Sequence, residues 1–78
     1  MDRCVALWRK HAGKLGEMRY MVVNIADSDL FYMEIVFDNT AYGPYRSLNA
    51  YAGCKDGMED ASTFALPLLS AALNNENA

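Results

Sequence analysis

One histidine, two cysteines and ten carboxylates are the side chains of this 78-residue chain that could support acid–base, nucleophilic or metal chemistry. A general base needs a carboxylate to orient it and a substrate within hydrogen-bond reach. His11 instead lies in an apolar helical pattern with Trp8 and Leu15, so we expect it to pack rather than catalyse. Cys4 lies seven residues before His11, about 10 Å along a helix axis, and no pattern brings Cys54 to it. The sequence therefore predicts a chain that is not an enzyme.

Metal and cofactor sites are not predicted either. Cys4, His11 and Cys54 could in principle meet around zinc, but structural zinc sites use four ligands in closely spaced pairs. The chain has no CxxC or HxxxH motif. The segment AYAGCKDGMED lacks the alternating acidic positions of a calcium-binding loop, and no GxGxxG or GKS/GKT motif is present. We expect no cofactor and no metal.

Residues 26–47, ADSDLFYMEIVFDNTAYGPYRS, concentrate four acidic side chains and three tyrosines. Turn chemistry accounts for Asp27 and Asp29, but Glu34 and Asp38 lie on one face of a predicted strand together with valine and tyrosine. Either another element covers this face, or it contacts another molecule, because tyrosine brings a large contact area with a polar tip. The candidate partner-binding residues are Glu34, Asp38, Tyr32, Tyr42 and Tyr45, followed by Asp27 and Asp29.

Two strands must position this segment, because hydrophobic residues alternate with a period of two over residues 18–38. A three-residue turn at residues 27–29 would place Val23 opposite Met33 and Met21 opposite Ile35. This register brings the apolar faces of both strands together, and a slip of one residue would reverse every side chain. We therefore expect Tyr20 to lie on the outward face with Glu34, and Asp29 to adopt a left-handed conformation.

Helices are predicted at both ends of the chain. Asp2 can cap a first helix, and Gly16 is a plausible left-handed C-cap. The apolar face of this helix comprises Cys4, Leu7, Trp8, His11 and Leu15. A second stripe, led by Glu59 and Asp60, comprises Met58, Ala61, Ala65, Leu68, Leu69, Ala72 and Leu73.

Three local features leave alternatives open. Residues 41–54 contain the breaker Gly43-Pro44 and form either a third strand over 41–48 or a short helix capped by Ser47. Pro67 either kinks the last helix or begins a new one. Residues 74–78 are expected to fray. The whole chain, 1–78, is predicted to be a single α+β domain, a small antiparallel sheet with the N-terminal and C-terminal helices packed on one face.

Charge is unevenly distributed. Residues 1–20 carry a net charge of +3, and residues 21–78 carry −6, which together give the overall −3. Most of the chain therefore repels phosphate, so direct nucleic-acid binding is not the first expectation. With no secretory leader or membrane span visible and only two cysteines, we expect a cytoplasmic protein with reduced thiols.

These features predict a non-enzymatic module that binds a partner protein. Acidic groups on a small scaffold can steer it to a basic groove and compete there with nucleic acid. Small phage and mobile-element inhibitors of host defence nucleases, such as anti-CRISPR inhibitors, work in this way, which is a similarity of type and not of sequence. The alternatives are a homodimeric structural domain, a small enzyme or enzyme subunit, and a nucleic-acid-binding regulator that uses Arg3, Arg9, Lys10 and Lys14.

Overall fold

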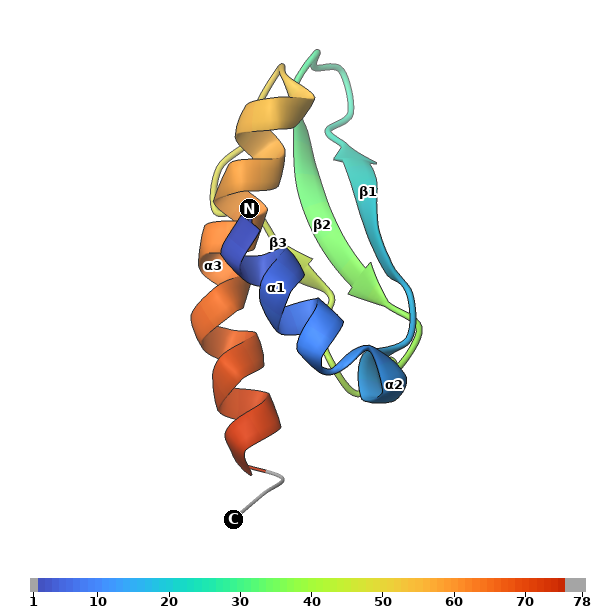
Figure 1. Ribbon diagram of the computed structural model, residues 1–78. Coiled ribbons are helices and arrows are strands. Elements are labelled where there is room, and N and C mark those ends of the chain that lie inside the picture. Colours follow the sequence, from blue (N-terminus) through green and yellow to red (C-terminus); the bar gives the residue numbers. More distant parts are fainter. Residues whose placement is uncertain (1, 76–78) are drawn as a thin grey trace.

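The computed structural model describes residues 2–75 and shows an α+β fold with a three-stranded antiparallel sheet (Figure 1). The strand order is β1-β2-β3. The predicted fold class is confirmed. In chain order the elements are α1 (Asp2–Lys10), α2 (Ala12–Leu15), β1 (Met18–Asn24), β2 (Phe31–Phe37), β3 (Tyr45–Arg46) and α3 (Cys54–Asn75).

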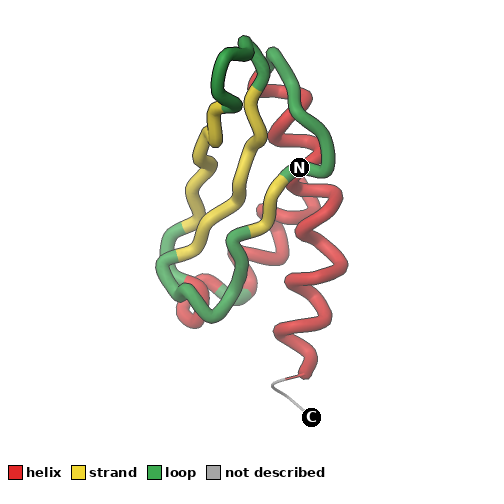
Figure 2. The backbone as a smooth tube through the Cα atoms, turned by 180° about the vertical axis from the view of Figure 1, so that it is seen from behind, coloured by secondary structure: helices red, strands yellow, loops and turns green. Residues whose placement is uncertain are grey.

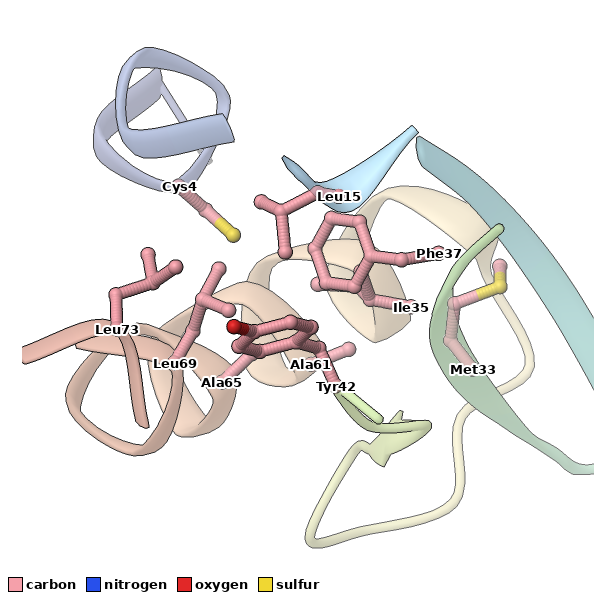
Figure 3. Packing of buried hydrophobic residues seen from close by; sticks show 10 residues of the cluster. All are labelled: Cys4, Leu15, Met33, Ile35, Phe37, Tyr42, Ala61, Ala65, Leu69 and Leu73. Carbon is pink, nitrogen blue, oxygen red and sulfur yellow. The ribbon is translucent and has the colours of Figure 1, made fainter. Parts of the chain in front are cut away.

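The molecule has two layers, with the helices against one face of the sheet. Helix α3 contacts β2 and β3, and α1 contacts α3. Seen from behind, the sheet lies in front of the helices (Figure 2). The core between the layers (Figure 3) comprises Cys4, Leu15, Met33, Ile35, Phe37, Tyr42, Ala61, Ala65, Leu69 and Leu73.

The predicted first helix is interrupted. His11 adopts φ −120° and ψ 22°, which ends α1 and separates it from the short α2. The Trp8 indole nitrogen donates a hydrogen bond to the Gly16 carbonyl at 2.7 Å, which folds the end of this segment back onto α1. Gly16 has the expected positive φ of 77°, although its ψ of −157° lies outside the left-handed helical region. Asp2 is the first residue of α1, and its predicted capping side chain lies outside the described residues.

The predicted register of the hairpin is wrong by one residue. Val22 pairs with Met33 and Tyr20 pairs with Ile35, so Tyr20 faces the helices. Its ring packs against the core, and its hydroxyl lies 3.0 Å from that of Ser62 on α3. The prediction placed Tyr20 on the outward face with Glu34, but an aromatic ring with a hydrogen-bond partner can be buried at little cost.

A four-residue loop produces this register. The Ile25 N–H donates to the Leu30 carbonyl at 3.3 Å, and the Ser28 N–H donates to the Ile25 carbonyl at 3.2 Å. Asp27, rather than Asp29, has the positive φ, at 61°. Aspartate tolerates this conformation better than most residues.

In residues 41–54 the strand alternative is the one observed. Ser47 does not cap a helix: its N–H donates to the Met33 carbonyl at 2.8 Å, and its hydroxyl accepts from the Met33 N–H at 3.1 Å. The ladder therefore continues one residue beyond β3. It resumes where Phe31 and Tyr51 exchange two hydrogen bonds of 2.9 Å.

Helix α3 is continuous through Pro67, so no new helix begins there. Its buried residues include Ser62, which the sequence stripe omitted, whereas Leu68 is 45% exposed. Asn74 and Asn75 are helical, and the rest of the predicted frayed tail, 76–78, lies outside the described residues. Within residues 2–75, no helix has the length and apolar character needed to cross a bilayer.

Candidate protein-binding surface

The strand residues that point away from the helices form one surface, which we call the outer face. Residues paired across neighbouring antiparallel strands share a face, and Met33, Ile35 and Phe37 are buried on the opposite one. Figure 2 views the sheet from the outer side, and no described helix crosses in front of the strands. The outer face comprises Arg19, Met21 and Val23 of β1, Tyr32, Glu34 and Val36 of β2, and Arg46 of β3.

Apolar side chains occupy the middle of the outer face. Met21 is 51% exposed, and Val23, Tyr32 and Val36 are half-buried. The corrected register puts Met21 and Val23 here in place of Tyr20 and Val22. The surface therefore differs in composition from the one expected, but its β2 half is as predicted.

Glu34 is neutralised within the outer face. Its carboxylate accepts from the Arg46 Nε at 3.2 Å, and a second guanidinium nitrogen lies at the same distance. The Arg46 guanidinium carbon also lies 5.2 Å from the centre of the Tyr32 ring. Arginine stacked on tyrosine and bound to a carboxylate is held in one orientation. Glu34 is thus part of a preformed Tyr32–Arg46–Glu34 cluster and not an isolated anion.

Asp38 lies at the edge of the outer face and has a structural role. Its carboxylate accepts from the Glu17 N–H at 3.0 Å and pairs with Arg19 at 2.8 Å. The Glu17 hydrogen bond, followed by the one from Arg19, holds the pKa of the Asp38 carboxyl below its ordinary value. These contacts fix the start of β1 against the end of β2.

Tyr42 and Tyr45 do not belong to the surface, contrary to the sequence-based expectation. Tyr42 is 3% exposed and its ring points between β2 and α3 (Figure 3). Tyr45 pairs with Ile35 and therefore faces inward, where its ring meets Phe37 edge-on, 6.4 Å between centres. Burial raises the pKa of Tyr45, although a hydrogen bond with Gly43 opposes this. Both rings contribute to the core.

Asp27 and Asp29 are exposed at the tip of the hairpin. Neither carboxylate forms an ion pair with another of the residues 2–75. The hairpin tip and the first turns of α3 lie at the same end of the molecule (Figures 1 and 2), so Asp56 and Glu59 add to the negative charge there. We call Asp27, Asp29, Asp56 and Glu59 the acidic end.

Asp60 lies close to this end, and its carboxylate is hydrogen-bonded to other groups of the protein. Its carboxylate accepts from the N–H groups of Leu48 and Asn49 at 2.9 and 3.1 Å, and from the Tyr51 hydroxyl at 2.7 Å. Partial burial alone would raise the pKa of Asp60, but these hydrogen bonds outweigh it and lower the pKa. An open pocket of about 390 Å³ beside it is lined by Asn49, Tyr51, Asp56, Glu59, Asp60 and Thr63.

The residues considered for chemistry are dispersed. Cys4 is buried on α1, Cys54 is exposed at the start of α3, and both are free thiols. His11 lies at the break between α1 and α2. In the part of the chain that the structure describes, no group of three or more histidine, cysteine or acidic side chains is placed to hold a metal ion.

Arg46, Met21 and Val23 were missed in the sequence. Arg46 could have been found from the third-strand alternative, since alternation within Tyr45–Arg46 turns one side chain inward and the other outward. Met21 and Val23 depended on the register. No protein-family model, curated protein or solved structure matches the chain. Function is therefore inferred from the surface alone.

Proposed function

We propose that this chain is a non-enzymatic protein-binding module that uses its outer face and hairpin tip to cover a surface of a partner protein. The observation that supports it is an apolar sheet face that no helix among residues 2–75 covers (Figure 2), in which Met21 is 51% exposed beside Tyr32 and Val36. A single sheet face of a two-layer domain that only contacts water usually carries polar side chains. An exposed apolar face is typical of an interaction site.

The Tyr32–Arg46–Glu34 cluster supports the same function. Tyrosine and arginine are the residue types most often found to dominate the binding energy of interfaces. Because the arginine is already oriented by the ring and the carboxylate, little side-chain freedom remains to be lost on binding. A partner would meet a preformed contact.

The charge of the surface favours a partner with a basic region next to an apolar one. Glu34 and Asp38 are paired with Arg46 and Arg19, so the centre of the outer face is balanced. Negative charge remains at Asp27 and Asp29, which continue the same hairpin. Such an end would steer the module towards a cationic groove and raise the association rate.

A cationic groove is a common feature of proteins that bind nucleic acid. Occupied by this module, it would be closed to its nucleic acid, which is how an inhibitor of a defence nuclease, of the anti-CRISPR kind encoded by phages, would act. We place this activity in the cytoplasm, where the two thiols stay reduced.

Substitution of Met21 tests the apolar part of the proposal. Met21→Asp puts a charge in the middle of the outer face, and we expect partner affinity to fall at least tenfold, equivalent to about 1.4 kcal/mol. Leu68→Asp is the matched control, because Leu68 is similarly exposed, at 45%, but lies on α3. Both variants and the wild type would be immobilised for capture from a lysate of the encoding organism, with bound proteins quantified by mass spectrometry. Equal capture by all three would contradict the proposal.

A charge exchange tests the hairpin tip. Asp27→Lys/Asp29→Lys and the control Asp56→Lys/Glu59→Lys change the net charge equally, but only the first alters the hairpin. We expect the hairpin variant to lower the association rate more than the control, with an effect that shrinks as salt is raised. Surface plasmon resonance with the captured partner, at several salt concentrations, would measure the association rate. Equal slowing by both variants would mean that net charge alone acts.

One observation favours a second function, nucleic-acid binding through α1 and α2. Arg3, Arg9, Lys10 and Lys14 are exposed on these helices, which form the basic part of the molecule. Binding through them would show a steep salt dependence in gel-shift titrations with double-stranded DNA. A steep slope that Lys10→Glu abolishes would favour this function over the first.

A further inference from the structure

Strand β1 forms an open edge of the sheet. Among residues 2–75 it has no strand neighbour other than β2, and in both views it lies at the boundary of the molecule (Figures 1 and 2). It is seven residues long, Met18–Asn24, whereas β3 at the opposite edge has two residues, follows Pro44, and is ended by the bend at Leu48 and Asn49. Of the two edge strands that the structure describes, β1 is the one long enough to pair with another strand.

The hydrogen bonds between β1 and β2 define which backbone groups of β1 point outward. The Asp38 N–H donates to the Glu17 carbonyl at 3.2 Å, and the Ile25 N–H donates to the Leu30 carbonyl at 3.3 Å. Bonded positions recur at every second residue of an antiparallel ladder. Arg19, Met21 and Val23 therefore bond to β2. The residues whose N–H and C=O groups point away from the sheet are Met18, Tyr20, Val22 and Asn24.

This edge lacks the usual protection against pairing. Exposed edges commonly carry proline, lysine, a bulge or a charge that points into the sheet. β1 has none of these, and its single charge, Arg19, lies on the outer face and is paired with Asp38. Instead, apolar side chains are exposed on both faces along the edge: Met21 is 51% exposed on the outer face and Val22 is 47% exposed on the inner one.

We propose that β1 pairs antiparallel with β1 of a second copy of this chain, which joins the two sheets into one of six strands. The two-fold axis passes through Met21, so Met21 lies opposite Met21 of the second copy. Tyr20 then lies opposite Val22, and Met18 opposite Asn24, of that copy. All the outward-pointing backbone groups of β1 find partners in this register.

Other registers are less favourable. Sliding one strand along the other by a single residue would oppose an outward-bonding residue to an inward-bonding one, so only displacements by an even number of residues preserve the hydrogen bonds. A displacement by two residues moves the axis from Met21 to Tyr20 or to Val22. Shifting the axis to Tyr20 brings Asn24 opposite Gly16, where the positive φ has already ended the strand. Shifting it to Val22 leaves Met18 without an opposing strand residue. The axis through Met21 also places Arg19 opposite Val23 and keeps the two arginines apart.

The dimer would extend the outer face rather than cover it. A two-fold axis through Met21 and perpendicular to the sheet keeps both outer faces on the same side. Self-association through the edge is thus independent of the proposed partner-binding function, and substitutions separate the two: Tyr32→Ala acts on the outer face, and Val22→Pro acts on the edge.

Sedimentation velocity across a concentration series measures the self-association. Val22→Pro removes an outward N–H but none of the bonds to β2, and proline is tolerated in edge strands. In the dimer this N–H occurs twice, so we expect the dissociation constant to rise about tenfold or more. Tyr32→Ala is the control and should leave the dimer intact. A wild-type chain that stays monomeric into the millimolar range, or a dimer weakened by Tyr32→Ala and not by Val22→Pro, would overturn the proposal.

Cysteine cross-linking tests the register and does not depend on how Val22→Pro folds. In a Cys54→Ser background, Met21→Cys places two thiols opposite each other at a non-hydrogen-bonded pair, where Cα atoms lie about 4.5 Å apart. We expect mild oxidation to give a covalent dimer. Val23→Cys in the same background is the control, because in the proposed register residue 23 lies opposite Arg19 of the second copy and the two introduced thiols are far apart. Efficient cross-linking of Val23→Cys, or none of Met21→Cys, would overturn the proposed register.

Discussion

Asp38 and Asp60 use their carboxylates to hold backbone segments in place. Asp38 accepts from the Glu17 N–H, and Asp60 accepts from the N–H groups of Leu48 and Asn49. Both pKa values lie below the ordinary one, because hydrogen bonds to the charged form stabilise it. At the scale of single residues, much of the chain's acidity is therefore committed to folding, and Asp27 and Asp29 are the predicted site acids that remain exposed without an ion pair among residues 2–75.

The lowered pKa of Asp38 predicts a pH dependence of stability. A folded-state pKa below the unfolded one stabilises the fold fully above the unfolded value, about 3.9, and this contribution is lost as the pH falls through the folded value. Asp38→Asn should thus be less stable than the wild type at pH 7, with a difference that narrows on acidification. Urea unfolding between neutral and acidic pH would measure it, with Asp29→Asn as a control that keeps the Glu17 contact. A difference that stays constant throughout would contradict the assignment.

At the scale of elements, the contact of α3 with β2 depends on a glycine. Gly57 is buried, and a Cβ atom there would lie 3.2 Å from the Cβ of Met33, closer than side chains normally pack. The small residue lets the helix approach the strand. This close approach, together with the Tyr20–Ser62 contact, links α3 to both long strands.

Two alanine substitutions test this close approach. Gly57→Ala gains helix propensity but forces α3 away from Met33, and we expect a net loss of about 1 kcal/mol in the free energy of unfolding. Gly13→Ala is the control, because it lies in α2 with nothing within 4 Å of the added Cβ; it should gain about 0.5 kcal/mol. Midpoints of urea unfolding at constant slope would report both. If both substitutions stabilised the protein, β2 would have moved to accommodate the new methyl group without loss of stability, and the close approach at Gly57 would not be required.

At the scale of the whole molecule, one thin core connects both layers. Cys4 on α1 is 1% exposed and belongs to the same cluster as Leu73 near the end of α3 and Phe37 on β2. Cys54, by contrast, is exposed. The two thiols therefore report on different parts of the structure.

Thiol labelling should distinguish them. Cys54 should react with a disulfide reagent at the rate of an exposed thiol. Cys4 should react at least tenfold more slowly, because it must wait for the protein to open and because burial raises the pKa of its thiol, which lowers the thiolate fraction. In denaturant the rates should converge, and Cys54→Ser should leave only the slow phase. Two equally fast thiols in native buffer would contradict the burial of α1 against α3.

The helices, the two long strands and the α+β class follow from the sequence, because periods of 3.6 and two are local properties that a window of residues displays. The inner position of Met33, Ile35 and Phe37 is equally clear, since these side chains form an unbroken apolar face on β2. Glu34 on the opposite face follows from the same alternation. These parts of the candidate surface needed no tertiary information.

The register, and with it half of the surface, was decided by tertiary contacts. The predicted register paired Met21 and Val23 with the apolar face of β2 and left Tyr20 outward, but α3 gives Tyr20 a core to pack on and Ser62 as a hydrogen-bond partner. These contacts favour the four-residue loop over the three-residue one. Tyr42 is buried and Tyr45 is partly buried because both rings pack into the core between the sheet and α3. Arg46 neutralises Glu34 only because β3 pairs with β2. A local sequence pattern predicts which side chains can share one apolar face of a helix or strand. Which of them are covered depends on elements distant in sequence, since burial is a property of the packed molecule.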